Sequence, residues 1–272
     1  MTEYIEALPA LLATARCNVC GSARLRETAN QVRRRLSEPI EARDLTAELR
    51  EGLVCPDCGS TSRDRCLIAV FATLLARERE ALSEWLPLDG VRILDCAGAR
   101  AHPTQLARVA DYFNTQYKAE AMSDPVIDGR VYADLQDLHY PDGFFDFVLS
   151  SDVFEHVRLH EVAFREVFRV LDGAGALVLQ VPYGHGLRRT MTRVHPTGDK
   201  DAYLYPPEYH AEQTLVYRIY GRDLLGLLNS LGFSVAYWEA RLDRYAVSPQ
   251  PMILATKAPF LDLTGFARWG SF

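Results

Sequence analysis

The alternation of apolar and polar residues becomes regular after about residue 90. Short apolar runs, the clearest at residues 91–95, 145–150 and 176–182, alternate with stretches whose apolar residues recur at helical spacing. Such alternation is typical of βαβ units built around a parallel sheet. The sequence therefore predicts an α/β fold for the larger part of the chain.

The remaining elements follow from the same pattern. Two more strands are expected at 114–120 and 131–135, and an amphipathic helix at 160–171 has its apolar residues on one face. A leucine-rich helix at 221–231 precedes two closing strands. These strands, at 233–240 and 252–258, are expected to form a hairpin in which one strand runs antiparallel to the sheet.

Two copies of a C-x-x-C-G-S pattern stand before this domain. They supply Cys17, Cys20, Cys55 and Cys58. Each copy resembles a zinc knuckle, and four thiolates complete a tetrahedral shell without an open position, which indicates a structural Zn²⁺ ion and not a catalytic one. Buried or redox-active cysteines are the alternative, and the duplication argues against it.

The cysteines also suggest a division of the chain. We expect a zinc-binding module at residues 1–66 that contains a charged helical insertion, and a second domain at 67–272. Cys66 and Cys96 fall in apolar segments and are expected to be packing residues.

Composition narrows the class of protein. The chain has 272 residues, 48% of them apolar, and no apolar run is long enough for a membrane span. Residues 1–16 lack the basic start and the small-residue cleavage site of a secretory signal, so a cytoplasmic protein without membrane association is expected. The net charge of −6 disfavours a nucleic-acid partner. The run Arg33, Arg34 and Arg35 is interpreted as a solvated helix face.

Three motifs in the middle of the chain carry a family resemblance. They are the acidic turn Asp134–Leu138 with the following Phe145-Asp146 pair, the segment 150–157, and the E-x-x-R-V-L pattern at 166–171. Together they resemble class I S-adenosylmethionine-dependent methyltransferases with a type 11-like core. The resemblance implies a Rossmann-like three-layer sandwich with a mostly parallel seven-stranded sheet, S-adenosylmethionine as cofactor, and a substrate cap at about 184–220.

The resemblance also assigns the cofactor contacts. Glu120 is the expected ribose ligand, with Asp124 as a competitor, and Asp134 is expected to accept from the adenine amino group. Ser151 would face the methionine part or the transferred methyl group. The full expected set is Asp95, Ala97, Gly98, Glu120, Asp134, Leu135 and Ser151. One departure is the first loop, where Ala97, Ala99 and Ala101 stand at positions that are usually glycine in the family.

Candidate catalytic residues follow the fourth and fifth strands or lie in the cap. They are His156, His185, His210 and Tyr183; a histidine near neutral pH could deprotonate the acceptor, although His156 could equally hold a loop. Three arginines of the cap are compatible with an anionic acceptor: Arg188, Arg189 and Arg193. The default interpretation is that they are exposed to solvent.

These observations favour methyl transfer to oxygen or nitrogen of a small-molecule biosynthetic intermediate or saccharide. An rRNA or tRNA methyltransferase with a zinc module and a non-catalytic binding protein of methyltransferase fold are the alternatives. The zinc module could clamp the acceptor, mediate homodimerisation or stabilise the N-terminus.

Overall fold

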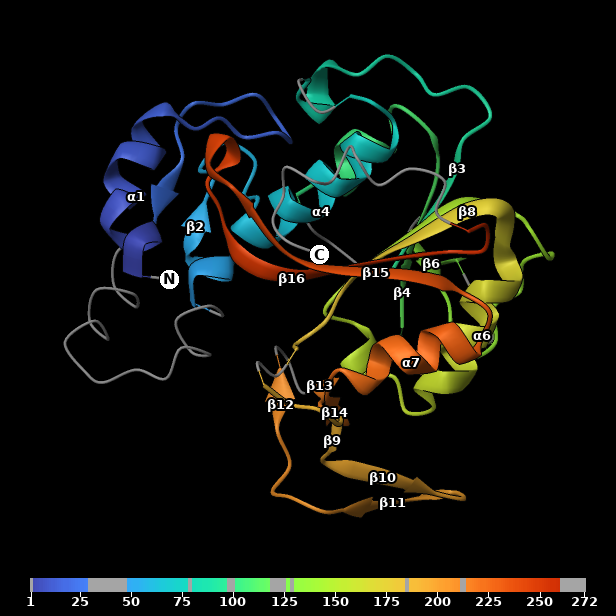
Figure 1. Ribbon diagram of the computed structural model, residues 1–272. Helices are drawn as coiled ribbons and strands as arrows, with labels where there is room; N and C mark the ends of the chain where they lie inside the picture. Colours follow the sequence, from blue (N-terminus) through green and yellow to red (C-terminus); the bar gives the residue numbers. More distant parts are fainter. Residues whose placement is uncertain are drawn as a thin grey trace.

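The computed structural model describes residues 2–28, 48–77, 80–96, 101–117, 126–127, 130–183, 186–210 and 214–259. An eight-stranded sheet lies at its centre (Figure 1), in the order β15-β16-β8-β7-β3-β4-β6-β5. The strands are β3 (Arg92–Asp95), β4 (Asp111–Gln116), β5 (Val126–Ile127), β6 (Arg130–Tyr132), β7 (Phe145–Ser151), β8 (Leu171–Gln180), β15 (Ser234–Leu242) and β16 (Val247–Thr256).

Five consecutive strands of this sheet, β8, β7, β3, β4 and β6, are parallel. Strand β16 pairs antiparallel with both β8 and β15, so the predicted closing hairpin is confirmed. The expected sheet had seven strands, and the eighth is the two-residue β5, which pairs antiparallel with β6. The central α/β fold and its mostly parallel sheet are as expected.

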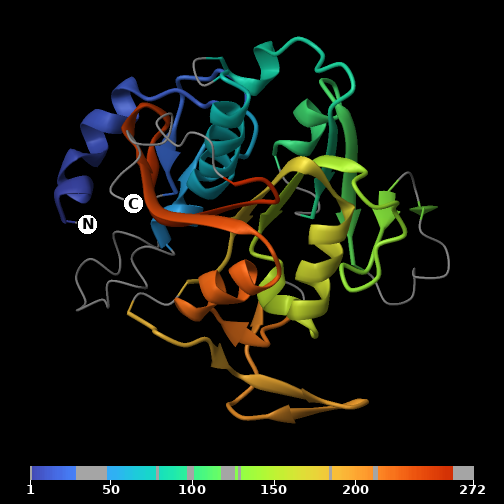
Figure 2. The same cartoon turned by 45° about the vertical axis from the view of Figure 1, so that its right-hand side comes forward.

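Successive residues of the central strands face two different hydrophobic cores. Ile93 and Leu94 of β3 belong to different buried clusters, and so do Val178 and Leu179 of β8. Helix α4 (Ser62–Leu74) covers one face, and α6 (His160–Val170) and α7 (Asp223–Ser230) cover the other (Figure 2). This period-two alternation is the reason the sheet carries a layer of helices on each side.

Helix α4 is buried on all sides. Thr61 caps its N-terminus by accepting from the Asp64 amide, and the Asp64 carboxylate accepts in return from the Thr61 amide. Every residue from Ser62 to Ala72 is buried. The helix therefore lies between the N-terminal segment and the sheet instead of on the molecular surface.

Further helices and 3-10 turns flank these elements. They are α1 (Thr2–Thr14), α5 (Pro103–Leu106) and the 3-10 turns η1 (Leu82–Glu84), η3 (Phe154–His156) and η4 (Asp243–Tyr245). None of the helices in the described ranges is long and apolar enough to cross a membrane.

The N-terminal segment and the sheet share one hydrophobic core. Strands β1 (Arg26–Glu27) and β2 (Leu53–Val54) pair antiparallel beside the cysteines. Cys17 and Cys55 belong to the same buried cluster as Trp238 and Leu254 of the closing hairpin. The expected domain boundary between residues 66 and 67 falls inside α4.

The expected cap segment forms three small antiparallel ribbons after β8, which lie together in Figure 1. They are β9 (Met191–Thr192) with β14 (Arg218–Ile219), β10 (Val194–Thr197) with β11 (Lys200–Tyr203), and β12 (Tyr209–His210) with β13 (Thr214–Leu215). Gly221 closes the insertion where a Cβ atom would lie 2.4 Å from the Arg189 carbonyl carbon. Only glycine allows this approach.

We expect stability to depend on pH through His160 of α6. Burial and the charge of Arg218 lower the pKa of His160 to about 3, against roughly 6.5 in the unfolded chain. As the pH falls below 6.5 the unfolded chain binds a proton that the folded chain does not, so stability is lost, by up to about 2 kcal/mol at pH 5. Urea unfolding at pH 7 and pH 5 should show a smaller difference for His160→Gln than for the wild type.

The matched control is His139→Gln, because the His139 side chain is 76% exposed. It should keep the wild-type pH dependence. An unchanged pH dependence in His160→Gln would show that His160 is not the group responsible.

Candidate functional site

The carboxyl ends of the five parallel strands lie at one edge of the sheet. The chain passes from β3 to β4 on one side of β3, and later returns to β7 on the other side. The strand order therefore reverses at β3, and in open α/β sheets ligands bind beyond the carboxyl ends of the strands at such a point. This edge is the candidate active site.

The structure brings several predicted cofactor residues to this edge. Asp95 ends β3, Asp134 and Leu135 follow β6, and Ser151 ends β7. Ala97, Gly98 and Glu120 lie outside the described residues, and so do Asp124 and the run at 33–35.

The Asp95 carboxylate is fully buried and is held by two side chains. His102 Nε2 lies 2.9 Å from Oδ2, and the Tyr112 hydroxyl donates to the same oxygen at 2.5 Å. Burial, together with the charge of Asp95 and the hydrogen bond to it, raises the pKa of Tyr112. Asp95 therefore ties the end of β3 to the start of α5 and to β4, which frame the first loop.

Asp134 is half-buried in the turn after β6. Its Oδ1 accepts from the backbone amide and the side-chain amide of Gln136, both at 2.9 Å. The neighbouring Leu135 is buried. This geometry orients the carboxylate and leaves it partly accessible at the edge of the sheet.

Beyond β7 the structure shows a buried polar network that the sequence did not predict. Asp152 has a φ of 51°, which is unusual for a residue other than glycine, and its amide donates to Gln180 O at 3.0 Å. Its carboxylate lies 3.0 Å from Arg50 Nη2 and 2.8 Å from Arg63 Nη1. Both arginines are buried; Arg50 precedes β2 and Arg63 lies in α4, so both segments contribute to the active-site edge.

The network continues to Ser151 and to the closing hairpin. Arg63 Nη1 donates to Ser151 Oγ at 3.3 Å, and Ser151 Oγ donates to Gln180 Oε1 at 2.9 Å. Gln180 in turn donates to Gln250 at 3.1 Å. The Ser151 hydroxyl is fully buried within these contacts.

Two of the predicted catalytic histidines meet at the same edge. The rings of His156 and His210 are 5.1 Å apart, and His156 Nε2 lies 3.6 Å from Glu155 Oε1. Burial raises the pKa of Glu155 and lowers that of His156. Glu155 was not predicted as a site residue, although the glutamate-histidine pair stands within the quoted segment 150–157.

The other two candidates are not placed in this cluster. His185 lies outside the described residues. The Tyr183 hydroxyl is buried, has no hydrogen-bond partner among the described residues, and its ring packs 5.1 Å from Tyr237.

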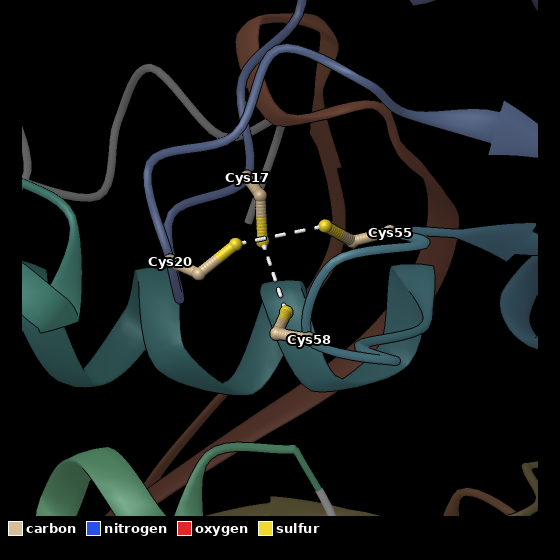
Figure 3. Close-up of side chains that lie close together, drawn as sticks. All are labelled: Cys17, Cys20, Cys55 and Cys58. Carbon is tan, nitrogen blue, oxygen red and sulfur yellow. Dashed lines mark hydrogen bonds between the residues drawn. The ribbon is translucent and has the colours of Figure 1, made fainter.

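The four N-terminal cysteines converge as the sequence predicted (Figure 3). The Sγ atoms of Cys17 and Cys58 are 3.7 Å apart, those of Cys20 and Cys55 are 3.6 Å apart, and all four lie within 4.8 Å of one another. A tetrahedral Zn²⁺ site with bonds of about 2.3 Å has sulfur–sulfur edges of about 3.8 Å. The donor set therefore fits zinc.

The two knuckles have the same backbone. In the first, the Cys17 amide donates to Ser22 O and the Gly21 amide to Cys17 O, and the Cys55 and Gly59 amides repeat this in the second. Gly21 and Gly59 have φ values of 79° and 77°, which explains the glycine after each C-x-x-C.

Comparison with known proteins identifies the class of the fold. Residues 92–179 match a family described as "Methyltransferase domain". The match runs from β3 almost to the end of β8, over about a third of the chain. This segment has the Rossmann-like α/β fold of methyltransferases.

Solved structures with low sequence identity were also found. A 1,6-didemethyltoxoflavin-N1-methyltransferase of Burkholderia thailandensis is 13% identical over 71% of this chain and 77% of that chain, with a TM-score of 0.45. An S-adenosylmethionine-dependent methyltransferase of Mesorhizobium loti is 17% identical over 72% of this chain and 97% of that chain, with a TM-score of 0.44. The search of curated proteins gave no match.

Proposed function

We propose that this chain is an S-adenosylmethionine-dependent methyltransferase that acts on a small-molecule acceptor. The match of residues 92–179 to a methyltransferase domain carries the proposal. The edge of the sheet at β3 is compatible with it, because strand order reverses there and Asp95, Asp134 and Ser151 lie at or just after the ends of β3, β6 and β7. Bound S-adenosylmethionine would supply an activated methyl group, which the acceptor displaces from a sulfonium.

We assign the residues at this edge to the two ends of the cofactor. We assign Asp134 and Leu135, after β6, to the adenine end of the cofactor, and Ser151 to the end that carries the methyl group. We assign Asp95 a positioning role at the end of β3, because its carboxylate bonds to His102 and Tyr112.

The acceptor would lie beyond β7, between the N-terminal segment and the cap. Asp152 is held from one side by Arg50 and Arg63, and His156 is held from the other by Leu215 O at 2.8 Å. Both side chains are fixed by these contacts, so an acceptor would be positioned with little reorganisation.

We further propose that Cys17, Cys20, Cys55 and Cys58 hold a structural Zn²⁺ ion. With four protein ligands the ion has no open position, so it takes no part in the chemistry. Its contribution would be to stabilise the segment that carries Arg50 and Arg63.

The test of the proposal is cofactor binding measured by calorimetry with S-adenosylhomocysteine. We expect the wild type to bind, and Asp134→Ala to bind about tenfold more weakly or worse, since a hydrogen bond to a charged group contributes about 1.5–3 kcal/mol. Asp137→Ala is the matched control, because Asp137 lies in the same turn with a side chain that is 79% exposed.

Each outcome decides a different part of the proposal. Absence of binding by the wild type would support a non-catalytic protein of methyltransferase fold. Equal affinity of Asp134→Ala and wild type would remove Asp134 from the cofactor site.

A further inference from the structure

Glu155 is a buried carboxyl group without a hydrogen-bond partner. Its side chain is completely inaccessible, and among the described residues neither of its oxygens has a partner. The nearby guanidinium groups of Arg50 and Arg63 bond to Asp152 and Glu51 instead. Leaving such a group unsatisfied costs free energy, so its position indicates a ligand.

His156 turns a free nitrogen toward this carboxyl group. Its Nδ1 lies 2.8 Å from Leu215 O, and because a carbonyl only accepts, Nδ1 carries the proton. Nε2 therefore keeps its lone pair, and it lies 3.6 Å from Glu155 Oε1. A histidine that donates one ring N–H to a backbone carbonyl and offers the other nitrogen has the arrangement usual for a metal ligand.

His210 of β12 brings a second imidazole from the cap. Its Nε2 lies 3.3 Å from the Glu208 carboxylate, which is itself 3.3 Å from Arg193 Nη1. Since a carboxylate accepts, Nε2 carries the proton and Nδ1 is free. One ligand atom from each of Glu155, His156 and His210 lies within 4.8 Å of the others.

The backbone around these residues is held rigidly. Arg218 is buried and donates to the carbonyl oxygens of Phe154, Val157 and Arg158. The Tyr217 amide donates to Glu155 O at 2.9 Å. The turn that carries two of the three side chains is thus fixed to the cap before any ligand binds.

From this geometry we propose that Glu155, His156 and His210 bind a divalent transition-metal ion at the acceptor side of the site. Two imidazoles and one carboxylate suit ions such as Mn²⁺, Fe²⁺, Co²⁺ and Zn²⁺, and three protein ligands leave positions open for a substrate. The site is distinct from the four cysteines, whose thiolates select zinc.

The metal site also indicates the chemical class of the methyl acceptor. This inference about the acceptor rests on the proposed function. An ion held by three protein ligands would have open positions for two neighbouring oxygens of a small molecule, as in a vicinal diol or a hydroxy acid. Coordination lowers the pKa of the bound hydroxyl, which releases its proton to solvent. The resulting oxygen forms a bond to the methyl carbon while the carbon–sulfur bond of the cofactor breaks, and S-adenosylhomocysteine leaves.

The experiment is a titration of the full chain with Mn²⁺. Electron paramagnetic resonance detects binding as a loss of the signal of the free Mn²⁺ ion. Mn²⁺ suits imidazole and carboxylate and binds thiolates poorly, so the cysteine site does not interfere. We expect about one Mn²⁺ per wild-type chain and at least about tenfold weaker binding by His210→Gln. The His210 side chain is 43% exposed, so this variant should fold.

His195→Gln is the matched control, because His195 is an exposed histidine in the neighbouring ribbon of the cap. It should bind Mn²⁺ as the wild type does. No binding by the wild type, or equal binding by His210→Gln, would overturn the metal site. If the chain binds Mn²⁺ but does not bind S-adenosylhomocysteine, the proposed function is contradicted and the metal site is supported.

Discussion

Replacing Cys17 and Cys58 together by serine is expected to abolish metal binding at the cysteine site and to destabilise the whole chain. The two residues come from different knuckles, so each half of the tetrahedral shell loses one thiolate. Metal binding at such sites contributes directly to folding, with apparent values of about 10–16 kcal/mol in zinc-finger peptides. Because the cysteines share a core with the sheet, we expect the free energy of unfolding to fall by more than about 4 kcal/mol.

The measurement uses Co²⁺ exchange, since cobalt bound to thiolates has a charge-transfer absorption that imidazole and carboxylate ligands lack. The wild type should show it and the double variant should not, while urea unfolding reports the stability. Cys66→Ala is the control, because Cys66 is fully buried outside the cluster and should leave the cobalt spectrum unchanged. A thiolate spectrum retained by the double variant would contradict the four-cysteine assignment.

The second large effect is expected at Arg65 of helix α4. Its guanidinium group is fully buried and donates to four backbone carbonyl groups at 2.7–3.1 Å. These are the carbonyls of Leu53, Ser60, Tyr245 and Ala246. Arg65 thus joins the second knuckle and its strand to the turn of the closing hairpin, and its own carbonyl accepts from Asn18 in the first knuckle at 2.8 Å.

Replacing Arg65 by methionine should destabilise the chain by about 4 kcal/mol or more. Methionine fills similar volume but removes the Arg65 donor from four buried carbonyls, of which the Ser60 carbonyl still accepts from the Cys55 amide. Each carbonyl left without a donor costs about 1–3 kcal/mol, less what partial relaxation recovers. The backbone acceptors cannot be replaced by apolar groups, so the compensation known for buried ion pairs does not apply. Urea unfolding of the purified variant measures the loss.

Arg165→Met provides the control for Arg65→Met. The Arg165 side chain is 63% exposed and pairs with Glu161 one turn away on α6, so its loss should change stability by less than about 0.5 kcal/mol. If Arg65→Met unfolds within about 1 kcal/mol of the wild type, the carbonyl contacts do not connect the two parts as described.

The elements predicted most accurately from the sequence are those whose signal lies within a few neighbouring residues. The apolar runs of β7 and β8 and the amphipathic face of α6 were predicted within a few residues, except that β8 begins at Leu171, earlier than the run at 176. The glycines after each cysteine pair signalled the left-handed residues that the knuckles contain. Such features depend on a residue and its near neighbours, so a linear pattern is sufficient to find them.

The candidate site was predicted less completely, because its residues come from separate segments. Ser151 and His156 were found through the methyltransferase resemblance, whereas Arg50 and Arg63 carry no local signal. They resemble other charged residues in a charged stretch. In the sequence, Glu155 resembles an ordinary exposed glutamate of a turn. Only the structure shows that its side chain is buried.

The amino-acid sequence by itself determined the α/β class, the order of the strands along the chain and the four-cysteine pattern, since periodicity and short motifs express local backbone preferences. Tertiary structure alone decided which distant residues meet. It placed the guanidinium groups of Arg50 and Arg63 beside Asp152, the cap's His210 beside His156, and the cysteine knuckles in the same core as the sheet. The physical reason is that burial and pairing depend on how the layers pack, and residues up to 200 positions apart, such as Arg50 and Gln250, come into contact only then.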